Sequence, residues 1–97
     1  MQFKLQFSEE AKLKLLELET SNSKRGVLKE VRKILGLMEK NLKHPSLNTH
    51  KFYGLACQLG DVFESYAQNN TPGAYRIFWV YGPGRGQIYI LDITSHP

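Results

Sequence analysis

The stretch AYRIFWVYGPGRGQIYILDI, residues 74–93, decides the fold of this chain. On either side of the glycine-rich segment 82–86, both arms are rich in β-branched and aromatic residues, a composition typical of strands. The segment between them predicts a five-residue turn and therefore an antiparallel hairpin. If that loop closes symmetrically, Arg76 lies opposite Asp92, and a β-bulge would shift the pairing by one residue.

In the symmetric register, the alternation of side chains along each strand assigns the hairpin residues to two faces. One face carries Arg76, Phe78, Val80, Ile88, Ile90, Asp92, Thr94 and His96. The other carries Tyr75, Ile77, Trp79, Tyr81, Tyr89, Leu91 and Ile93. The aromatic second face suits either a core or a stacking surface, and the pattern leaves open which face the helices cover.

Two further strands are predicted outside the hairpin. Residues 62–67, VFESYA, alternate in character, and the turn composition of residues 69–73 joins them to the hairpin, so three consecutive strands should form an antiparallel meander. Residues 2–7, QFKLQF, place their large apolar side chains on one side at period two. This first strand is expected to join the same sheet, because alone it has no partner.

Two helices are predicted between the first strand and the meander. Ser8 is a candidate N-cap for a helix that runs to about Glu19. The second helix follows the turn residues 20–23 and ends before Pro45. Its apolar residues recur at helical spacing at Val27, Val31, Ile34 and Met38. Residues 44–60 have neither period and contain two glycines, so we interpret them as a connecting loop.

The order βααβββ predicts an α+β fold. A helix hairpin should pack on one face of a four-stranded, mainly antiparallel sheet and leave the other face open. The whole chain, residues 1–97, is expected to form one domain. The residues expected to hold the second helix on the sheet are Val31, Ile34, Met38, Ile77, Trp79 and Leu91.

Charge is unevenly distributed along the chain. The formal net charge is +4, and residues 1–51 hold 11 of the 13 Lys and Arg against six acidic residues. Such a basic half favours a polyanionic partner, either a nucleic acid or an acidic peptide, although a solvated helix surface has the same composition. The amino-terminal residues lack the apolar core of a signal peptide, and the single Cys57 suits a reducing compartment, so a cytoplasmic location is expected.

Motifs of the common cofactor enzymes are absent from the sequence. It contains no GxxxxGK[ST], no GxGxxG and no paired CxxC, and its three histidines lack metal-ligand spacing, so we expect neither a cofactor nor a metal. A set of dispersed polar residues near the sheet could instead serve RNA backbone cleavage: His50, Lys51, Glu64, Tyr66, Arg76 and His96. That reaction needs a base, a cation for the phosphorane charge and an acid, whereas the simpler interpretation is surface salt bridges and loop caps.

Three stretches resemble the toxins of the RelE/ParE superfamily, which belong to type II toxin–antitoxin systems. They are HPSLNTHKFYGL after the second helix, VFESY, and AYRIFWVY followed by IYILDITSHP. The resemblance covers nearly the whole chain and depends on the order and spacing of these motifs. It implies a ribosome-dependent mRNA endonuclease that inhibits translation and is neutralised by an antitoxin in a hetero-oligomeric complex.

The same resemblance implies roles for individual residues. Arg76 falls at the phosphate-binding arginine of the endonucleases, and His96 falls near their carboxy-terminal acid or base. The expected catalytic residues are Arg76, His96, His50 and Glu64, and the expected substrate-binding residues are Lys51, Tyr66 and Arg85. Glu64 and Tyr66 occupy strand positions at which the type member of the family's endonucleases carries lysines. A ParE-like gyrase inhibitor and a catalytically inactive binding module therefore stay open as alternatives, as does a purely structural pair between Arg76 and Asp92.

Overall fold

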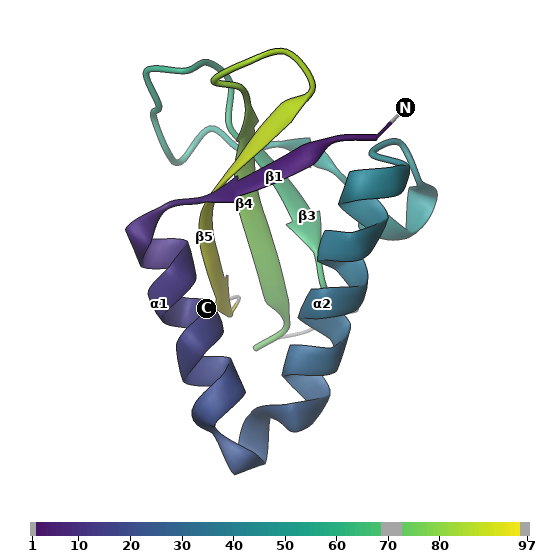
Figure 1. Cartoon of the computed structure of the whole chain (residues 1–97), viewed down its shortest axis with the longest axis vertical. Coiled ribbons are helices and arrows are strands. Elements are labelled where there is room, and N and C mark those ends of the chain that lie inside the picture. Colours follow the sequence, from purple (N-terminus) through teal and green to yellow (C-terminus); the bar gives the residue numbers. More distant parts are fainter. Residues whose placement is uncertain (1, 69–72, 96–97) are drawn as a thin grey trace.

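Two helices cover one face of a five-stranded sheet in a computed structural model that describes residues 2–68 and 73–95 (Figure 1). The elements are β1 (Lys4–Phe7), α1 (Glu9–Thr20), η1 (Asn22–Lys24), α2 (Arg25–Lys40), η2 (Pro45–Leu47), β2 (His50–Lys51), β3 (Phe63–Tyr66), β4 (Tyr75–Tyr81) and β5 (Gln87–Ser95). The predicted α+β class and helix hairpin are confirmed. The sheet has five strands where four were predicted, because a two-residue strand inside the segment 44–60 leaves no periodic signal in the sequence.

The strands lie in the order β1-β5-β4-β3-β2. The predicted antiparallel meander of β3, β4 and β5 is present, and β2 adds to its outer edge in antiparallel fashion. The first strand joins the other side of the sheet, where β1 runs parallel to β5 with Lys4 opposite Gln87 and Phe7 opposite Ile90. The parallel pair thus joins the first and the last strand of the chain, which are separated by both helices and by β2, β3 and β4.

The register of the hairpin differs from the symmetric one by two shifts of one residue each. The turn closes with Tyr81 opposite Ile88 instead of Gln87, and a β-bulge further along adds the second shift. Phe78 lies opposite Asp92 but Trp79 lies opposite Ile90, so Leu91 has no partner on β4. The symmetric register was wrong: Arg76 faces Thr94 rather than Asp92. The first shift moves Ile88 and Ile90 to the face that the helices cover, and the bulge returns Asp92, Ile93 and Thr94 to the faces predicted for them.

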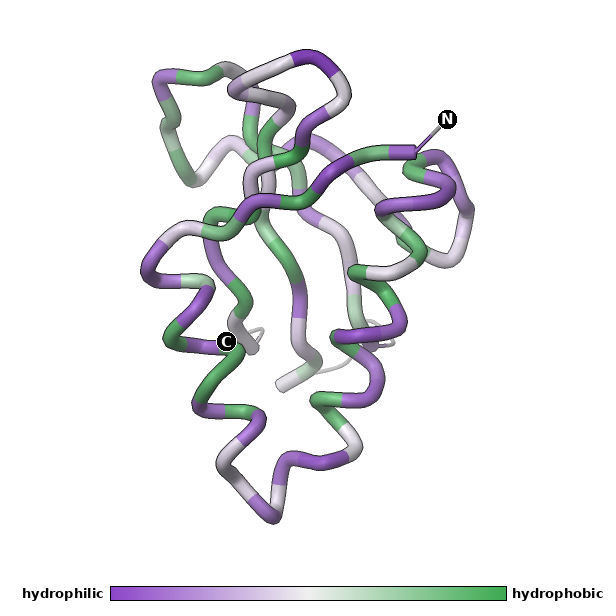
Figure 2. Tube along the Cα trace, viewed as in Figure 1, coloured by the Kyte–Doolittle hydropathy of each residue, from purple (hydrophilic) through white to green (hydrophobic). Residues whose placement is uncertain are grey.

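The corrected faces differ from the prediction mainly along β5. Ile88, Ile90 and Ile93 are all fully buried against the helices. Leu91 is only partly buried and packs on the opposite face, so its assignment to the main core was wrong. The other predicted core residues, Val31, Ile34, Met38, Ile77 and Trp79, are buried between the helices and the sheet. Hydrophobic and hydrophilic residues alternate along both helices, as expected for helices with one buried side (Figure 2).

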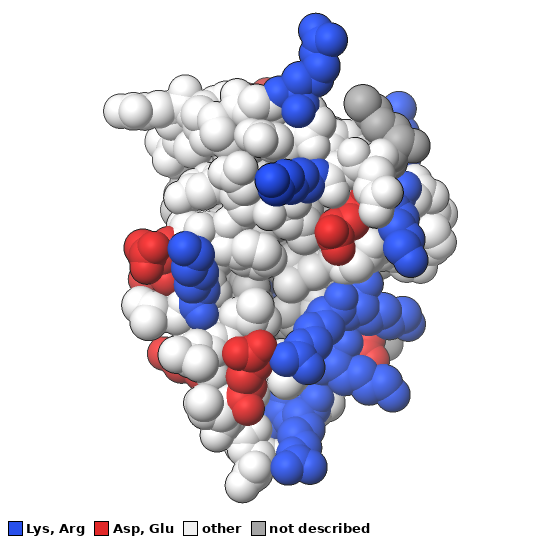
Figure 3. Space-filling view, in the orientation of Figure 1, with Lys and Arg blue, Asp and Glu red and all other residues white. Residues whose placement is uncertain are grey.

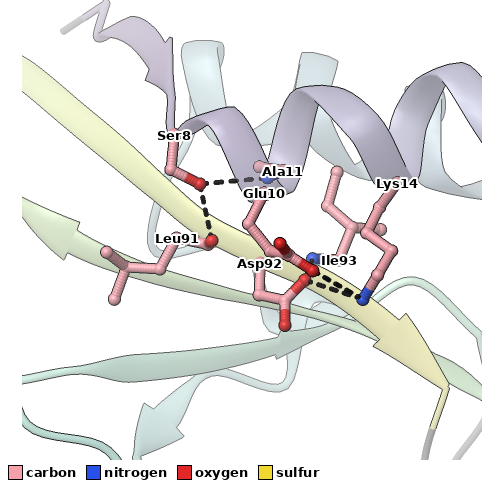
Figure 4. A network of polar contacts seen from close by, with 7 residues as sticks. All are labelled: Ser8, Glu10, Ala11, Lys14, Leu91, Asp92 and Ile93. Carbon is pink, nitrogen blue, oxygen red and sulfur yellow. Dashed lines mark hydrogen bonds and ion pairs between the residues drawn. The ribbon is translucent and has the colours of Figure 1, made fainter.

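A polar network fastens the start of α1 to the bulge (Figure 4). The Ser8 hydroxyl accepts a hydrogen bond from the Ala11 amide at 3.0 Å, as the predicted N-cap should, and donates one to the Leu91 carbonyl at 2.7 Å. Lys14 Nζ lies 3.2 Å from Asp92 Oδ1. The bulge thus leaves a carbonyl and a carboxylate directed at α1, and α1 satisfies both.

The face of the sheet away from the helices was expected to be open, but it is partly covered. A second, smaller apolar cluster forms there around Val62, Phe78 and Val80. Phe52, which follows β2, packs on Phe78 with ring centroids 4.7 Å apart. The segment that follows Phe52 forms a loop beside the hairpin end of the sheet (Figure 1). One end of this face is therefore covered, and the remainder carries the polar residues considered next.

Candidate functional site

The candidate site is a cluster of charged side chains on this second face of the sheet. His50 Nε2 lies 2.6 Å from Glu64 Oε1, and Arg76 Nη1 lies 2.5 Å from Glu64 Oε2. Only 3% of the Glu64 side chain and 12% of the Arg76 side chain are exposed, whereas 48% of His50 is exposed. One buried carboxylate therefore joins a buried guanidinium to an imidazole that solvent and a ligand can reach.

Strand register explains why these three residues meet. Glu64 in β3 lies directly opposite His50 in β2, and Tyr66, two residues further along β3, lies opposite Arg76 in β4. Glu64 and Arg76 are therefore diagonal neighbours on one face, within reach of long side chains. The Tyr66 ring also lies 5.7 Å from the His50 ring, centroid to centroid. The structure thus brings together four of the seven predicted site residues: His50, Glu64, Tyr66 and Arg76.

Aromatic rings enclose the guanidinium of Arg76. Its Cζ lies 4.8 Å from the centre of the Phe78 ring and 5.7 Å from that of Phe52, distances at which a cation is attracted by the ring faces. The Nε of Arg76 is buried without a hydrogen-bond partner among the described residues. The alternative pair between Arg76 and Asp92 is wrong, because Asp92 bonds to Lys14 instead.

His50 faces an oxygen at each ring nitrogen. Its Nδ1 lies 3.1 Å from the carbonyl oxygen of Asn48, and its Nε2 contacts the Glu64 carboxylate. A carbonyl and an ionised carboxylate can only accept hydrogen bonds. The neutral ring can donate to one of them, whereas the imidazolium donates to both. These contacts fix the orientation of the ring, with Nε2 directed at the carboxylate, while 48% of the side chain stays exposed.

Burial raises the pKa of the Tyr66 phenol above its ordinary value of 10.0, and the negative charge of Glu64 raises it further. The nearby positive charge of Arg76 opposes this shift but does not cancel it. Tyr66 is therefore a hydrogen-bond donor at neutral pH, not a base.

The other three predicted site residues lie outside the cluster. Lys51 pairs with Asp61, its Nζ 3.2 Å from the carboxylate, across the base of the loop that follows β2. Arg85 is exposed in the turn between β4 and β5. His96 lies outside the described residues. Within the ranges 2–68 and 73–95, no group of three His, Cys, Asp or Glu side chains is placed to hold a metal ion.

Phe52 belongs to the site but was not predicted. It follows His50 by two residues, and in an extended chain that spacing places both side chains on the same face. This signal was present in the sequence, but residues 44–60 were interpreted as a loop, where period two carries no meaning.

Of the helices in the described chain, none has both the length and the apolar character required to cross a membrane.

Two helices on one face of such a mixed sheet form the fold of RelE-type toxins. A chain of the YoeB–YefM complex from Staphylococcus aureus superposes with a TM-score of 0.68 at 15% identity, and a chain of the YoeB dimer from the same organism with 0.66 at 14%, each over the full length of both chains. A chain of the archaeal RelE–RelB complex from Pyrococcus horikoshii OT3 superposes with 0.65 at 11%, over 98% of this chain and 96% of that one. The predicted RelE-like fold is therefore confirmed. No protein-family model and no curated protein matches the sequence.

Proposed function

We propose that this chain is the toxin of a type II toxin–antitoxin module and that it cleaves mRNA in the ribosomal A site. The observation that carries the proposal is the cluster of His50, Glu64 and Arg76, exposed at His50, on the sheet face of a fold shared with RelE and YoeB. The site of action would be the cytoplasm, where ribosomes translate mRNA.

The cluster contains groups suited to cleavage of an RNA backbone. In that reaction the 2′-oxygen bonds to phosphorus after losing its proton, and the bond from phosphorus to the 5′-oxygen breaks as that oxygen gains a proton. His50 would supply the second proton, held in position by Glu64. Arg76 would offset charge on the phosphorane. His96 is the candidate for taking the first proton, a role that comes from the sequence resemblance alone.

The partner of the chain would be an acidic antitoxin. The solved structures that share the fold include RelE–RelB and YoeB–YefM complexes, and this chain carries a net charge of +4. Opposite charges speed association and favour the correct partner. We expect the product of an adjacent reading frame to copurify with the chain as a hetero-oligomer that tightens at low salt.

A second candidate function is binding without chemistry, as a gyrase inhibitor or an inactive toxin-like module. The observation that favours it is the pairing of Arg76 with Glu64, because the guanidinium is already neutralised before any phosphate arrives. Cleavage requires the phosphate to compete with that carboxylate for the guanidinium, whereas binding alone does not.

Induction of the chain in a growing bacterium separates the two functions. Protein synthesis and plasmid supercoiling are measured in parallel for the wild type, for His50→Gln and for Lys12→Gln, a matched control on the exposed surface of α1. An mRNA endonuclease should stop protein synthesis first, and His50→Gln alone should relieve the arrest. A change in supercoiling ahead of any effect on protein synthesis would replace the endonuclease with the gyrase inhibitor.

A further inference from the structure

A cavity of about 400 Å³ lies where the chain leaves α2 and where β4 ends, on the side of the sheet that the helices cover. Residues 42–45 form one wall, residues 48–49 add to it, and three aromatic side chains of the sheet form another: Phe63, Trp79 and Tyr81. Small-molecule sites have volumes of about 300–1,000 Å³, so this aromatic pocket is large enough for one. It is separate from the charged cluster of His50, which lies on the other face of the sheet.

The three rings form a corner. The rings of Phe63 and Trp79 stack with their centroids 4.8 Å apart, and the Tyr81 ring is inclined by 79° to Trp79 and by 81° to Phe63. Trp79 is only 1% exposed, so the core is already closed beneath the pocket, whereas Tyr81 is 50% exposed. A planar ligand can therefore lie flat on one ring with its edge toward another, as aromatic groups prefer.

The surroundings of the pocket are basic. α2 carries five Lys and Arg against two Glu, and positive side chains gather over this helix (Figure 3). Beyond the helix, the exposed Lys43 borders the pocket, and none of the described residues that line it is acidic. His44 Nδ1 accepts a hydrogen bond of 3.0 Å from the Ser46 amide, so the neutral ring holds its proton on Nε2 and can donate it in a hydrogen bond. A cation and a donor therefore stand beside the aromatic wall, and both suit a phosphate.

A chain of hydrogen bonds leads from the core to the pocket. The indole Nε1 of Trp79 donates to Ser65 Oγ at 2.9 Å, and this buried oxygen lies 2.7 Å from the hydroxyl of Thr49. If Ser65 donates its own proton to Thr49, the proton of Thr49 is free to bond a ligand. The pocket thus offers a hydroxyl group held in place from below, which can bond to the polar edge of a planar ligand.

We propose that the aromatic pocket binds a single unpaired nucleotide, with its base against the rings of Phe63 and Tyr81 and its phosphate at Lys43. A nucleotide combines the two properties for which the pocket is built, a planar aromatic group and a negative charge. The same chemistry is found in a free nucleotide and in one nucleotide of an RNA strand. The proposal goes beyond the cleavage reaction, because the pocket and the charged cluster lie on opposite faces of the sheet.

NMR titration of the isotopically labelled full chain with uridine monophosphate and adenosine monophosphate tests the pocket. The chain has one tryptophan, so the Trp79 indole N–H gives a single signal, and its bond to Ser65 couples it to Thr49. Nucleotide binding should shift this signal. Tyr81→Ala should weaken binding at least roughly fivefold through the loss of a stacking contact. Tyr53→Ala, the same change at an exposed tyrosine outside the pocket, should leave binding unaltered.

The phosphate contact is tested by comparing uridine monophosphate with uridine. Lys43→Gln should weaken binding of the monophosphate by roughly twofold to fivefold, the size of an exposed ion pair, and should leave binding of uridine unchanged. A uridine hexamer that binds more tightly than the monophosphate, with the same dependence on Tyr81, would assign the pocket to RNA. Equal affinities would assign it to free nucleotides.

Three results would overturn the proposal. They are an unshifted Trp79 signal with all of these ligands, wild-type affinity in Tyr81→Ala, and wild-type affinity of Lys43→Gln for the monophosphate. Loss of binding in His50→Gln would also overturn it, because the nucleotide would then occupy the charged cluster. Since the measurement is binding without ribosomes, its outcome is independent of whether the induced chain arrests translation.

Discussion

At the scale of single residues, Glu64 is the group on which the site depends. Its carboxylate is 97% shielded from solvent yet contacts both Arg76 and His50. A buried charged group is costly unless it is paired, and both oxygens of this carboxylate have a partner. Arg76 could serve the fold, the chemistry or both through this one contact with Glu64. Measuring the unfolding free energy and the cleavage activity of the same variants distinguishes these roles.

Arg76→Ala should lower the free energy of unfolding by about 3 kcal/mol, because it leaves the Glu64 carboxylate buried without the guanidinium that pairs with it. The double variant Arg76→Met with Glu64→Leu should lose less than the single variant, since it removes both charges and retains apolar volume. Denaturant titrations of the three proteins measure this directly. A single variant as stable as the wild type would show that the pair contributes nothing to folding.

Ionisation of Tyr66 should lower the stability of the protein at alkaline pH. Burial, and then the charge of Glu64, raises the pKa of its phenol in the folded chain above the ordinary 10.0, so the folded state holds this proton more tightly than the unfolded state does. The resulting stabilisation is complete below pH 10 and is lost as the pH rises through the folded pKa. The unfolding free energy of the wild type should fall more steeply above pH 10 than that of Tyr66→Phe. Parallel curves for the two proteins would contradict this account.

At the scale of elements, the bulge at Leu91 marks the limit of prediction from sequence. The periodicity of α2 and the composition of the hairpin arms identify their elements because each signal repeats over several residues. The bulge involves a single leucine with no glycine beside it, so nothing local reveals it. The meeting of Glu64 with Arg76 was likewise inaccessible, because it depends on the register between β3 and β4.

Ser8→Ala tests how firmly α1 is fastened to the bulge. The substitution removes both the N-cap bond from the Ala11 amide and the bond to the Leu91 carbonyl, and it should cost about 1–2 kcal/mol of unfolding free energy. Ser23→Ala, in the exposed η1 segment, is the matched control and should change stability by less than about 0.5 kcal/mol. Equal losses from the two variants would show that the network in Figure 4 adds no stability.

At the scale of the whole molecule, the two sides of the sheet have separate tasks. The side under the helices holds the main core, including Trp79, Ile77 and Met38, and it stabilises the fold. The other side carries a small apolar cluster at one end and the charged cluster of His50 beside it. Because the charged cluster lies outside the main core, substitution of the exposed His50 should change chemistry with little loss of folding.

Cleavage of mRNA on purified ribosomes tests the central claim most directly. A defined message is translated with the wild-type chain, with His50→Gln and with Lys12→Gln, and primer extension maps any new 5′-ends. The account predicts cuts within the A-site codon that require ribosomes, an unchanged rate for Lys12→Gln, and a rate at least roughly 100-fold lower for His50→Gln, the usual size of a lost proton-transfer group. An intact message with the folded wild type, or equal cleavage by His50→Gln, would contradict it.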